Sequence, residues 1–242
     1  MKILQSVKKF FEKTFFHPKW RCVCCGKEIF NEEAYCNECL QNLPYIKEKF
    51  CNHCGRQTID NEEYCSTCKN ILVSIDKSRS VFNYKPPINK LILKAKYHGD
   101  KYLLKIFAEE LEKLYLKNDF RVDALCYVPM TKKAKRKRTY NQAEILCREL
   151  ASKINFPVVD CLEKRIETQK QAKLDRAGRL KNLENAFFVT DRKAVKGKSL
   201  LLVDDVTTTG STAEAVAYKL KKAGASKIYL LTVASVEPID KY

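Results

Sequence analysis

No run of apolar residues in this sequence approaches the roughly 20 residues that a membrane-spanning helix needs, so no membrane span is expected. Glycine and proline are also scarce, with seven of each among 242 residues. Because 45% of the residues are hydrophobic, the composition is that of a folded globular chain. A chain of this length suits one or two domains and can bury a real core.

A secretion signal is absent as well. Residues 1–20 are basic, but their apolar side chains are spaced along one helix face and interrupted by charged residues, so an amphipathic helix is expected there. Without an export signal, the cytoplasm is the expected location. In that reducing compartment, the twelve cysteines are better suited to metal binding than to disulfide formation.

Acidic residues are few compared with basic ones. The 29 Asp and Glu against 46 Lys and Arg give a formal net charge of +17. This excess favours anionic partners such as nucleic acid, nucleotides or membrane surfaces, and the alternative is simply a soluble basic protein. The densest run, residues 131–138, holds six Lys or Arg, which either contact phosphates or form a solvated face.

Nine of the twelve cysteines fall between Cys22 and Cys68, where the sequence repeats itself with an offset of 29 residues. Each copy has two Cys-x2-Cys pairs separated by ten residues, with Gly directly after the first pair and Tyr directly before the second. Two such pairs complete a tetrahedral site of four thiolates around zinc, and the glycine permits the left-handed backbone that the turn needs. A closed site of this kind is structural rather than catalytic.

Sequential pairing, with one zinc ion for each copy, is the simplest arrangement, and a crossed arrangement is the alternative. In the sequential arrangement the ligands are Cys22, Cys25, Cys36 and Cys39 for one ion, and Cys51, Cys54, Cys65 and Cys68 for the other. Cys24 and His53 occupy equivalent positions inside the two turns and are expected to lie outside the ligand sets. The remaining cysteines, Cys126, Cys147 and Cys161, sit among apolar residues and are expected in the core.

From about residue 72 onward the apolar pattern alternates between strands and helices. Helices are expected at residues 88–96, 102–117, 141–154 and 211–223; strands at 124–129, 158–162, 199–203 and 227–234; and a mobile loop at 164–181. This alternation implies a mostly parallel sheet. The predicted domains are an N-terminal helix (1–20), a double zinc ribbon (21–71) and an α/β domain (72–242).

In residues 200–212 a buried strand runs into two adjacent acids and then into a hydroxyl-rich turn that opens a helix. Backbone N–H groups at a helix start bind anions, and the hydroxyls around Gly210 add donors. Asp204 and Asp205 would repel phosphate, but they suit the 2- and 3-hydroxyls of an attached ribose. The stretch therefore predicts a site for a phosphorylated ribose, and the alternative is a Thr-capped helix after a solvent-facing Asp pair. The Gly-x4-Gly-Lys pattern of nucleoside-triphosphate loops is absent.

This stretch closely resembles the phosphoribosyl pyrophosphate (PRPP) signature of type I phosphoribosyltransferases, and the chain as a whole is similar to the ComF/GntX family, named for DNA-uptake competence. The other matching motifs are residues 96–100 (KYHGD), Val128-Pro129, residues 138–143 (RTYNQA), Thr168-Gln169 and Arg179-x2-Asn182. The resemblance implies a type I phosphoribosyltransferase-like, mostly parallel sheet flanked by helices, preceded by a small double zinc-ribbon domain. The family usually has Gly where Thr139 stands, and often a second Pro where Met130 stands.

The resemblance also implies roles for particular residues. Asp204 and Asp205 would hold the ribose hydroxyls and, as the catalytic residues, stabilise the positive charge that builds on the sugar ring. The turn after Pro129 would face the pyrophosphate, and Mg²⁺ would be carried by PRPP itself. The implied PRPP-binding residues are Asp204, Asp205, Val206, Thr207, Thr208, Thr209, Gly210, Ser211 and Thr212. The basic candidates for pyrophosphate or nucleic acid are Lys133, Arg136, Arg138, Arg176 and Arg179.

Single-stranded DNA is an expected partner, because aromatic residues of the ribbon segment could stack on bases. These residues are Tyr35, Tyr45, Phe50 and Tyr64, beside Lys47, Lys49 and Arg56, and a role in the core of a small module is the alternative for each. Three functions stay open: a PRPP-binding protein of DNA uptake that contacts single strands and competence-machinery proteins, a metabolic phosphoribosyltransferase with an unknown acceptor, and a non-catalytic adaptor that senses a nucleotide.

Overall fold

The computed structural model of the protein describes residues 20–30, 33–47, 50–56, 58, 63–65, 68, 74–166 and 185–236. The helix expected at residues 1–20, apart from Trp20, and most of the loop expected at 164–181 lie outside these residues. The chain forms two compact units, Met1–Leu43 and Pro44–Tyr242. The second copy of the cysteine repeat therefore shares a compact unit with the α/β sheet, and the sequence boundary near residue 72 stays a prediction.

The first unit holds the first copy of the cysteine repeat. Its turn is closed by a hydrogen bond from the Gly26 N–H to the Cys22 carbonyl oxygen, at 2.8 Å. Gly26 has a φ of 77°, which confirms the left-handed position expected directly after the first cysteine pair. A short helix, α2 (Asn37–Gln41), carries Cys39.

The second copy repeats this turn at the edge of the sheet. The Gly55 N–H donates to the Cys51 carbonyl oxygen at 2.9 Å, and Gly55 has a φ of 68°. A Cβ atom at Gly55 would lie only 2.7 Å from the Ser78 carbonyl oxygen of strand β1 (Lys77–Asn83). Glycine is therefore required twice here, for its backbone conformation and for the close approach of the ribbon to the strand.

Arg79 fastens this ribbon to the strand. Its guanidinium donates to the backbone oxygen and the side-chain oxygen of Asn52, both at 3.3 Å, and to Asn118 Oδ1 at 3.1 Å. The same guanidinium lies over the ring of Phe50, 4.1 Å from its centroid. A buried arginine with several acceptors and an aromatic face is well compensated for its burial.

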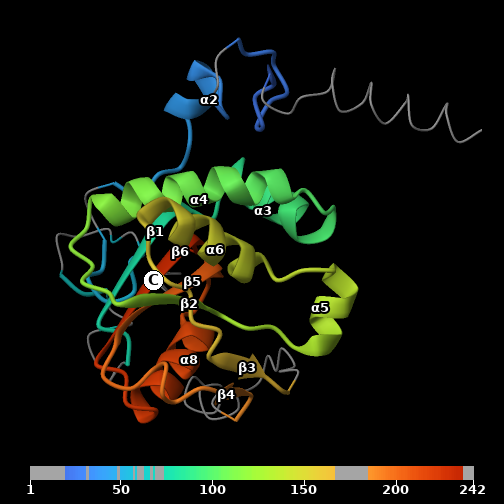
Figure 1. Ribbon diagram of the computed structural model, residues 1–242. Coiled ribbons are helices and arrows are strands. Elements are labelled where there is room, and N and C mark those ends of the chain that lie inside the picture. The colour runs from blue at the N-terminus through green and yellow to red at the C-terminus, as the bar shows by residue number, and fades with distance from the viewer. Residues whose placement is uncertain are drawn as a thin grey trace, which may run out of the picture. The chain divides into compact units, whose positions relative to one another are not determined.

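Four parallel strands form the sheet, in the spatial order β1-β6-β5-β2 (Figure 1). Beside β1, the strands are β2 (Ala124–Tyr127), β5 (Ser199–Thr207) and β6 (Lys227–Ser235). In the register of the two central strands, Leu202 lies opposite Leu230 and Asp204 lies opposite Thr232. Nearly continuous burial along β5 and β6 follows from helices covering both faces, as expected for a parallel sheet.

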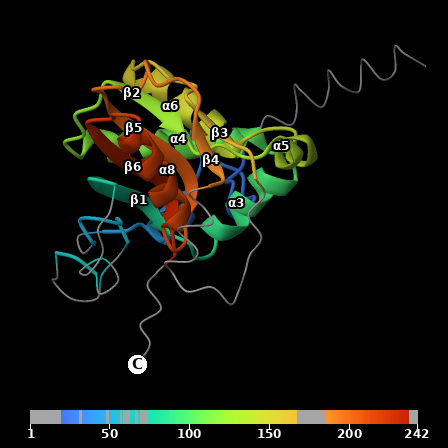
Figure 2. The same ribbon diagram turned by 90° about the horizontal axis from the view of Figure 1, so that it is seen from below.

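Helices form the outer layers of this fold. They are α3 (Ile88–Tyr97), α4 (Lys101–Leu116), α5 (Lys132–Arg138), α6 (Gln142–Ile154) and α8 (Ser211–Lys222). Helices α4 and α6 pack together on one face of the sheet, and α8 lies across β5 and β6 on the other (Figures 1 and 2). The expected type I phosphoribosyltransferase-like arrangement, a mostly parallel sheet flanked by helices, is confirmed.

The hydrophobic core under α8 is built from small residues on the helix and large residues on the strands. Ala213, Val216 and Ala217 of α8 are buried against Leu202 and Leu230. Small side chains let the helix approach the sheet closely. Cys126, Cys147 and Cys161 are each at most 1% exposed, which confirms their expected place in the core.

Two of the expected strands have different limits in the structure. The strand predicted to end at Val203 continues to Thr207, because β6 is long enough to pair with it through Ser235. The strand predicted at residues 158–162 is wrong as a single element. Val158 makes only an isolated parallel bridge to Leu125, and the chain then enters the antiparallel hairpin of β3 (Leu162–Lys164) and β4 (Phe187–Val189).

Helix α5 and strand β1 were not expected from the sequence. In α5 six of seven residues are basic, so the apolar periodicity that marks a helix is missing. The Thr131 side chain nevertheless caps it by accepting from the Ala134 N–H at 3.1 Å. Among the described residues, no helix has the length and apolar character needed to cross a membrane.

Candidate functional site

The two adjacent acids of the expected ribose site lie within β5 rather than after its end. Asp204 pairs with Thr232 of the neighbouring strand, and Val206 pairs with Ala234. Strand pairing thus fixes the backbone that carries both carboxylates, at the carboxyl edge where α/β folds bind ligands.

Lys96 makes the central contact of this site. Its Nζ atom lies 2.8 Å from Asp205 Oδ2, and both side chains are largely buried, with 18% and 13% of their surfaces exposed. Burial alone lowers the pKa of Lys96, but the neighbouring Asp205 carboxylate outweighs this, so the net pKa is raised above its ordinary value. The ion pair joins the end of α3 to the carboxyl part of β5 and keeps Lys96 charged.

Asp204 has a different electrostatic state. Burial, and then the nearby Asp205 carboxylate, raise the pKa of Asp204 to about 8, although the Lys96 charge opposes this shift. Asp204 Oδ1 accepts a hydrogen bond from the Asp205 backbone N–H at 2.8 Å. Two carboxylates this close favour a shared proton, or a ligand that donates hydroxyl groups to them.

The expected phosphate-binding turn, residues 207–212, comes directly after these two acids in the sequence. Thr207 ends β5, Thr208 and Thr209 lie exposed in the turn, and Gly210 with a φ of 78° precedes the first turn of α8, which contains Ser211 and Thr212. Thr209 Oγ1 and Ser211 Oγ lie 2.9 Å apart. The positive φ at Gly210 turns the chain into the helix, whose first-turn N–H groups can bind an anion at this end.

The expected pyrophosphate turn lies beside these acids in the sheet order. Strand β2 neighbours β5, and the chain passes from β2 through Pro129 and Met130 into α5. Thr139 ends α5 with a φ of 68°, a conformation that is costly for a β-branched residue and natural for glycine. This left-handed conformation explains why glycine suits the position, and Thr139 adopts the same conformation despite its side chain.

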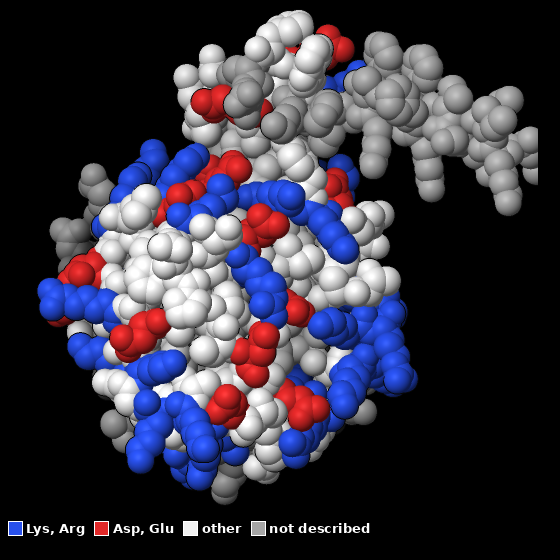
Figure 3. Space-filling model, in the orientation of Figure 1, with Lys and Arg blue, Asp and Glu red and all other residues white. Residues whose placement is uncertain are grey.

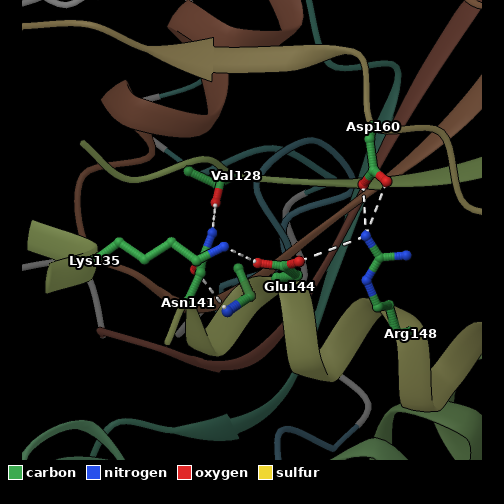
Figure 4. A network of polar contacts seen from close by, with 7 residues as sticks. Val128, Lys135, Asn141, Glu144, Arg148 and Asp160 are labelled. Atoms are coloured by element: carbon green, nitrogen blue, oxygen red, sulfur yellow. Dashed lines mark hydrogen bonds and ion pairs between the residues drawn. The ribbon is translucent and has the colours of Figure 1, made fainter. Parts of the chain in front are cut away.

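A polar network orders the basic helix against α6. Lys135 Nζ lies 2.9 Å from Glu144 Oε2, and Arg148 bridges Glu144 at 3.5 Å and Asp160 at 2.8 Å (Figure 4). Asn141 donates from its side chain to the Val128 carbonyl oxygen at 3.0 Å and also caps α6. Lys135 is therefore engaged within the protein.

The other basic candidates on α5 differ in their surroundings. Lys133 and Arg136 lie exposed, whereas Arg138 is half-buried and donates to the Tyr97 hydroxyl at 3.3 Å. Arg136 and Lys137 make no ion pair within the part of the chain that the structure describes. Lys and Arg gather over α5 on the face shown in Figure 3. Arg176 and Arg179 lie outside the described residues.

Lys96 was not selected as a site residue from the sequence. It appeared there only as the first residue of the KYHGD motif, since a lysine on a helix usually points to solvent. The available signal was that this lysine lies in the last turn of an amphipathic helix, in a chain that also carries an Asp-Asp pair. The structure connects these two motifs, which are separated by more than one hundred residues.

Both cysteine repeats form four-thiol clusters in the sequential arrangement. In each cluster the sulfur atoms lie within 4.8 Å of one another. Two of the Sγ–Sγ distances are 3.8 Å (Cys25 to Cys36) and 3.7 Å (Cys54 to Cys65). Thiolates about 2.3 Å from a central zinc ion in a tetrahedron lie about 3.8 Å apart, so the clusters fit structural zinc. Cys24 and His53 belong to neither cluster.

The structure corrects most of the expected stacking residues in the ribbons. Tyr35 is 4% exposed, and Tyr45 packs against Phe82 with its hydroxyl donating to Glu110. Phe50 lies under the Arg79 guanidinium. Tyr64 is exposed, and Arg56 is buried, with 6% of its surface exposed. Small modules need their aromatic residues for packing, which removes Tyr35, Tyr45 and Phe50 from a DNA-facing surface, whereas Tyr64 stays exposed.

Replacing one ligand in either cluster should release one zinc ion. We expect two ions per chain in the wild type and one in each of Cys22→Ser and Cys51→Ser, because three thiolates no longer close a tetrahedral site. Metal analysis of the purified chains measures this, with the buried core cysteine change Cys126→Ser as the control that keeps two ions. A wild-type content below two ions would contradict the assignment of two sites.

The raised pKa of Asp204 should make protein stability depend on pH. Since the folded chain holds this proton up to a pKa of about 8, against 3.8 ordinarily, stability is lost as the pH rises from about 4 to about 8. Asp204→Asn has no such proton to lose. The difference in free energy of unfolding between this variant and the wild type should therefore shift in favour of the variant by about 1–3 kcal/mol as the pH rises from 5 to 8.5.

Denaturant titrations at both pH values measure this difference in zinc-containing buffer. Asp119→Asn, a change at an exposed carboxylate 76% accessible, serves as the control. A constant difference between Asp204→Asn and the wild type at both pH values would rule out the shifted proton.

Two domain families match this chain. The double zinc ribbon domain covers residues 13–69, and the phosphoribosyl transferase domain covers residues 141–240. Among solved structures, the allosteric regulatory enzyme of purine biosynthesis is similar with a TM-score of 0.39, at 18% identity over 54% of this chain and 26% of that chain.

Three relatives are similar to this chain over different shares of its length. Competence protein F of Haemophilus influenzae is 27% identical over 89% of this chain and 96% of its own length. Competence protein ComFC of Streptococcus pneumoniae is 33% identical over 62% of this chain and 64% of its own length. DNA utilization protein YhgH of Salmonella typhi is 30% identical over 62% of this chain and 67% of its own length. With its double zinc ribbon, its phosphoribosyltransferase fold and these relatives, the chain belongs to the ComF/GntX family.

Proposed function

We propose that this protein binds PRPP at the junction of β5 and α8 and acts in DNA uptake, where its basic surface and ribbons handle single-stranded DNA. The observation that carries the PRPP assignment is the buried Lys96–Asp205 ion pair beside Asp204. These acids lie directly before the hydroxyl-rich turn at residues 207–212, which would bind the phosphate. The names of the relatives, which are competence and DNA utilization proteins, support the biological role. The cytoplasm, where thiol clusters stay reduced, is the proposed location.

The site has the chemistry for both ends of a ribose phosphate. The free N–H groups at the start of α8 and the hydroxyls of Thr209 and Ser211 would bind the 5-phosphate. Asp204 and Asp205 would accept hydrogen bonds from the ribose hydroxyls. A ribose hydroxyl that donates a hydrogen bond to Asp205 would replace the contact with Lys96. The Lys96 charge would then be available to the anionic pyrophosphate.

Displacement of pyrophosphate would build positive charge on the sugar ring, which the two acids would stabilise, with Asp205 as the charged member below the Asp204 pKa of about 8. Mg²⁺ bound with PRPP supplies neutralisation of the leaving pyrophosphate. Met130 and the N-terminal part of α5 follow β2 beside this position, so α5 is proposed as the basic wall on the pyrophosphate side. Measuring the release of pyrophosphate from PRPP decides whether a nucleophile completes the transfer. An adaptor that only senses a nucleotide would release none.

The proposed DNA surface centres on α5 rather than on the aromatic residues of the ribbons. Arg136 and Lys137 are exposed on this helix, while Lys135 is held by Glu144. Phosphate groups of a single strand would release counterions on contact with these charges. Competence-machinery proteins are proposed as further partners on the strength of the relatives' names.

Removing both carboxylates should abolish PRPP binding. In Asp204→Asn combined with Asp205→Asn, the amides are weaker acceptors for the ribose hydroxyls and no longer hold Lys96, so the heat of PRPP binding in calorimetry should disappear. A matched double change at exposed acids, Asp119→Asn with Asp191→Asn, should bind as the wild type does. Unchanged affinity in the Asp204/Asp205 variant, with circular dichroism confirming the fold, would refute the ribose assignment.

Removing two charges from α5 should weaken the binding of single-stranded DNA and its dependence on salt. For Arg136→Ala with Lys137→Ala, the slope of log affinity against log salt should fall by about 1.4, as expected for two lost contacts to a single strand. Fluorescence anisotropy with a labelled oligonucleotide measures this slope. Arg192→Ala with Lys193→Ala, two exposed basic residues in the segment before the amino end of β5, is the matched control. Equal slopes in both double variants would count against α5 as the DNA surface.

A further inference from the structure

A small cavity lies between the phosphate-binding turn and the second ribbon. Residues of β1 and β6 form part of its wall, and its volume of about 30 Å³ has room for about two water-sized groups. The cavity is therefore too small for a base or a sugar ring, but it suits the oxygen atoms of one small anion. The residues that face each other across it are Thr207, Thr209, Gly210 and Glu214 from the turn and α8, and His53 and Arg56 from the ribbon.

Arg56 brings a buried positive charge to this cavity. Only 6% of its surface is exposed, and among the described residues its Nε atom has no hydrogen-bond partner. Its guanidinium also forms no ion pair with an acid in the described part of the chain. A buried cation without a partner is costly, because it loses its hydration and gains no compensating charge. The surroundings of Arg56 therefore indicate a place for an anion.

Glu214, the acid in the cavity wall, does not neutralise Arg56. Its Oε1 atom accepts a hydrogen bond from the backbone N–H of Ser74. Within the residues that the structure describes, Glu214 pairs with no basic side chain. Its contact instead joins the segment before β1 to the first turn of α8, which helps to fix the position of the phosphate-binding turn.

The metal-binding turn of the second ribbon fixes the backbone of Arg56. The Cys51 N–H donates to the Arg56 carbonyl oxygen at 2.8 Å. Lys27 occupies the equivalent position in the first copy of the repeat, where its carbonyl oxygen accepts from the Cys22 N–H, also at 2.8 Å. Lys27 is exposed, however, whereas Arg56 is buried in the wall of the cavity. The same local turn thus holds a basic residue in two different environments.

We propose that Arg56 binds the phosphate group at the turn before α8, so that the second zinc ribbon contributes a residue to the phosphate site. The first-turn N–H groups of α8 and the Thr209 hydroxyl would bind the phosphate from one side, and Arg56 would bind it from the other. The planar, permanently charged guanidinium suits phosphate oxygens. This inference rests on the proposed function, because it needs a phosphate at residues 207–212.

The alternative is that Arg56 only offsets the charge of the neighbouring metal cluster. Four thiolates around one Zn²⁺ leave a net negative charge, and Cys54 and Cys68 of this cluster also border the cavity. In that case, loss of the Arg56 charge would weaken zinc binding and leave the affinity for phosphate unchanged. Measuring both zinc content and phosphate affinity therefore separates the two roles.

Calorimetry with ribose 5-phosphate on the full zinc-loaded chain tests the proposal. Arg56→Gln removes the charge and keeps a polar side chain, and we expect its affinity to be at least about tenfold lower than that of the wild type. Arg56→Lys, which keeps the charge but not the planar fork, should recover part of this loss. Lys27→Gln, the same change at the equivalent position of the first ribbon, is the matched control and should bind as the wild type does. Metal analysis should find two zinc ions in each variant.

If Arg56→Gln and Lys27→Gln bind ribose 5-phosphate equally well, the role of Arg56 is overturned and the ribose phosphate site stands. Loss of a zinc ion from Arg56→Gln would also overturn it, because the residue would then belong to the support of the metal cluster. If the wild type does not bind ribose 5-phosphate, the proposed function fails and this inference fails with it.

Discussion

The ion pair between Lys96 and Asp205 is the contact on which the proposed site depends. An aspartate pair on a nearly buried strand would be costly without a compensating cation, because each carboxylate loses water. Lys96 supplies that cation from the end of α3, and its reach fixes how far this helix lies from β5. Asp204 nevertheless has a raised pKa, because burial and the neighbouring Asp205 carboxylate outweigh the opposing Lys96 charge.

The second ribbon is part of the same compact unit as the sheet, and the reason is visible in a few contacts. Gly55 allows the metal-binding turn to reach the Ser78 carbonyl, and Arg79 ties Asn52 and Asn118 together. A four-thiol site that holds this turn therefore also supports the edge strand of the sheet. The proposed role of zinc is structural, and its effect extends to β1 through these contacts.

Much of the fold was predictable from the sequence. The spacing of apolar residues predicted α4, α6 and α8, and the cysteine repeat predicted both thiol clusters, because each pattern depends on local periodicity. Helix α5 and strand β1 were missed, since a run of basic residues has no apolar face and β1 follows a segment without a clear signal. The burial of Tyr35 and the packing of Tyr45 against Phe82 could not be predicted, because they depend on which surfaces meet after folding.

Part of the candidate site could likewise be predicted from the sequence, and part could not. The strand, loop and helix at residues 200–212 were recognisable because their donors and acceptors are contiguous. Lys96 comes from a motif more than one hundred residues earlier, and only the arrangement of strands and helices brings its side chain to Asp205. Thr139 is a similar case, because its left-handed conformation is visible only in the structure.

An experimental structure of the zinc-loaded protein with PRPP and Mg²⁺ tests the central claim most directly. The account predicts that Asp204 and Asp205 accept hydrogen bonds from the ribose hydroxyls, that the 5-phosphate lies against the start of α8, and that Lys96 has left Asp205 for the pyrophosphate. PRPP bound elsewhere, or bound here with the Lys96–Asp205 pair intact and the ribose out of contact with both acids, would contradict it.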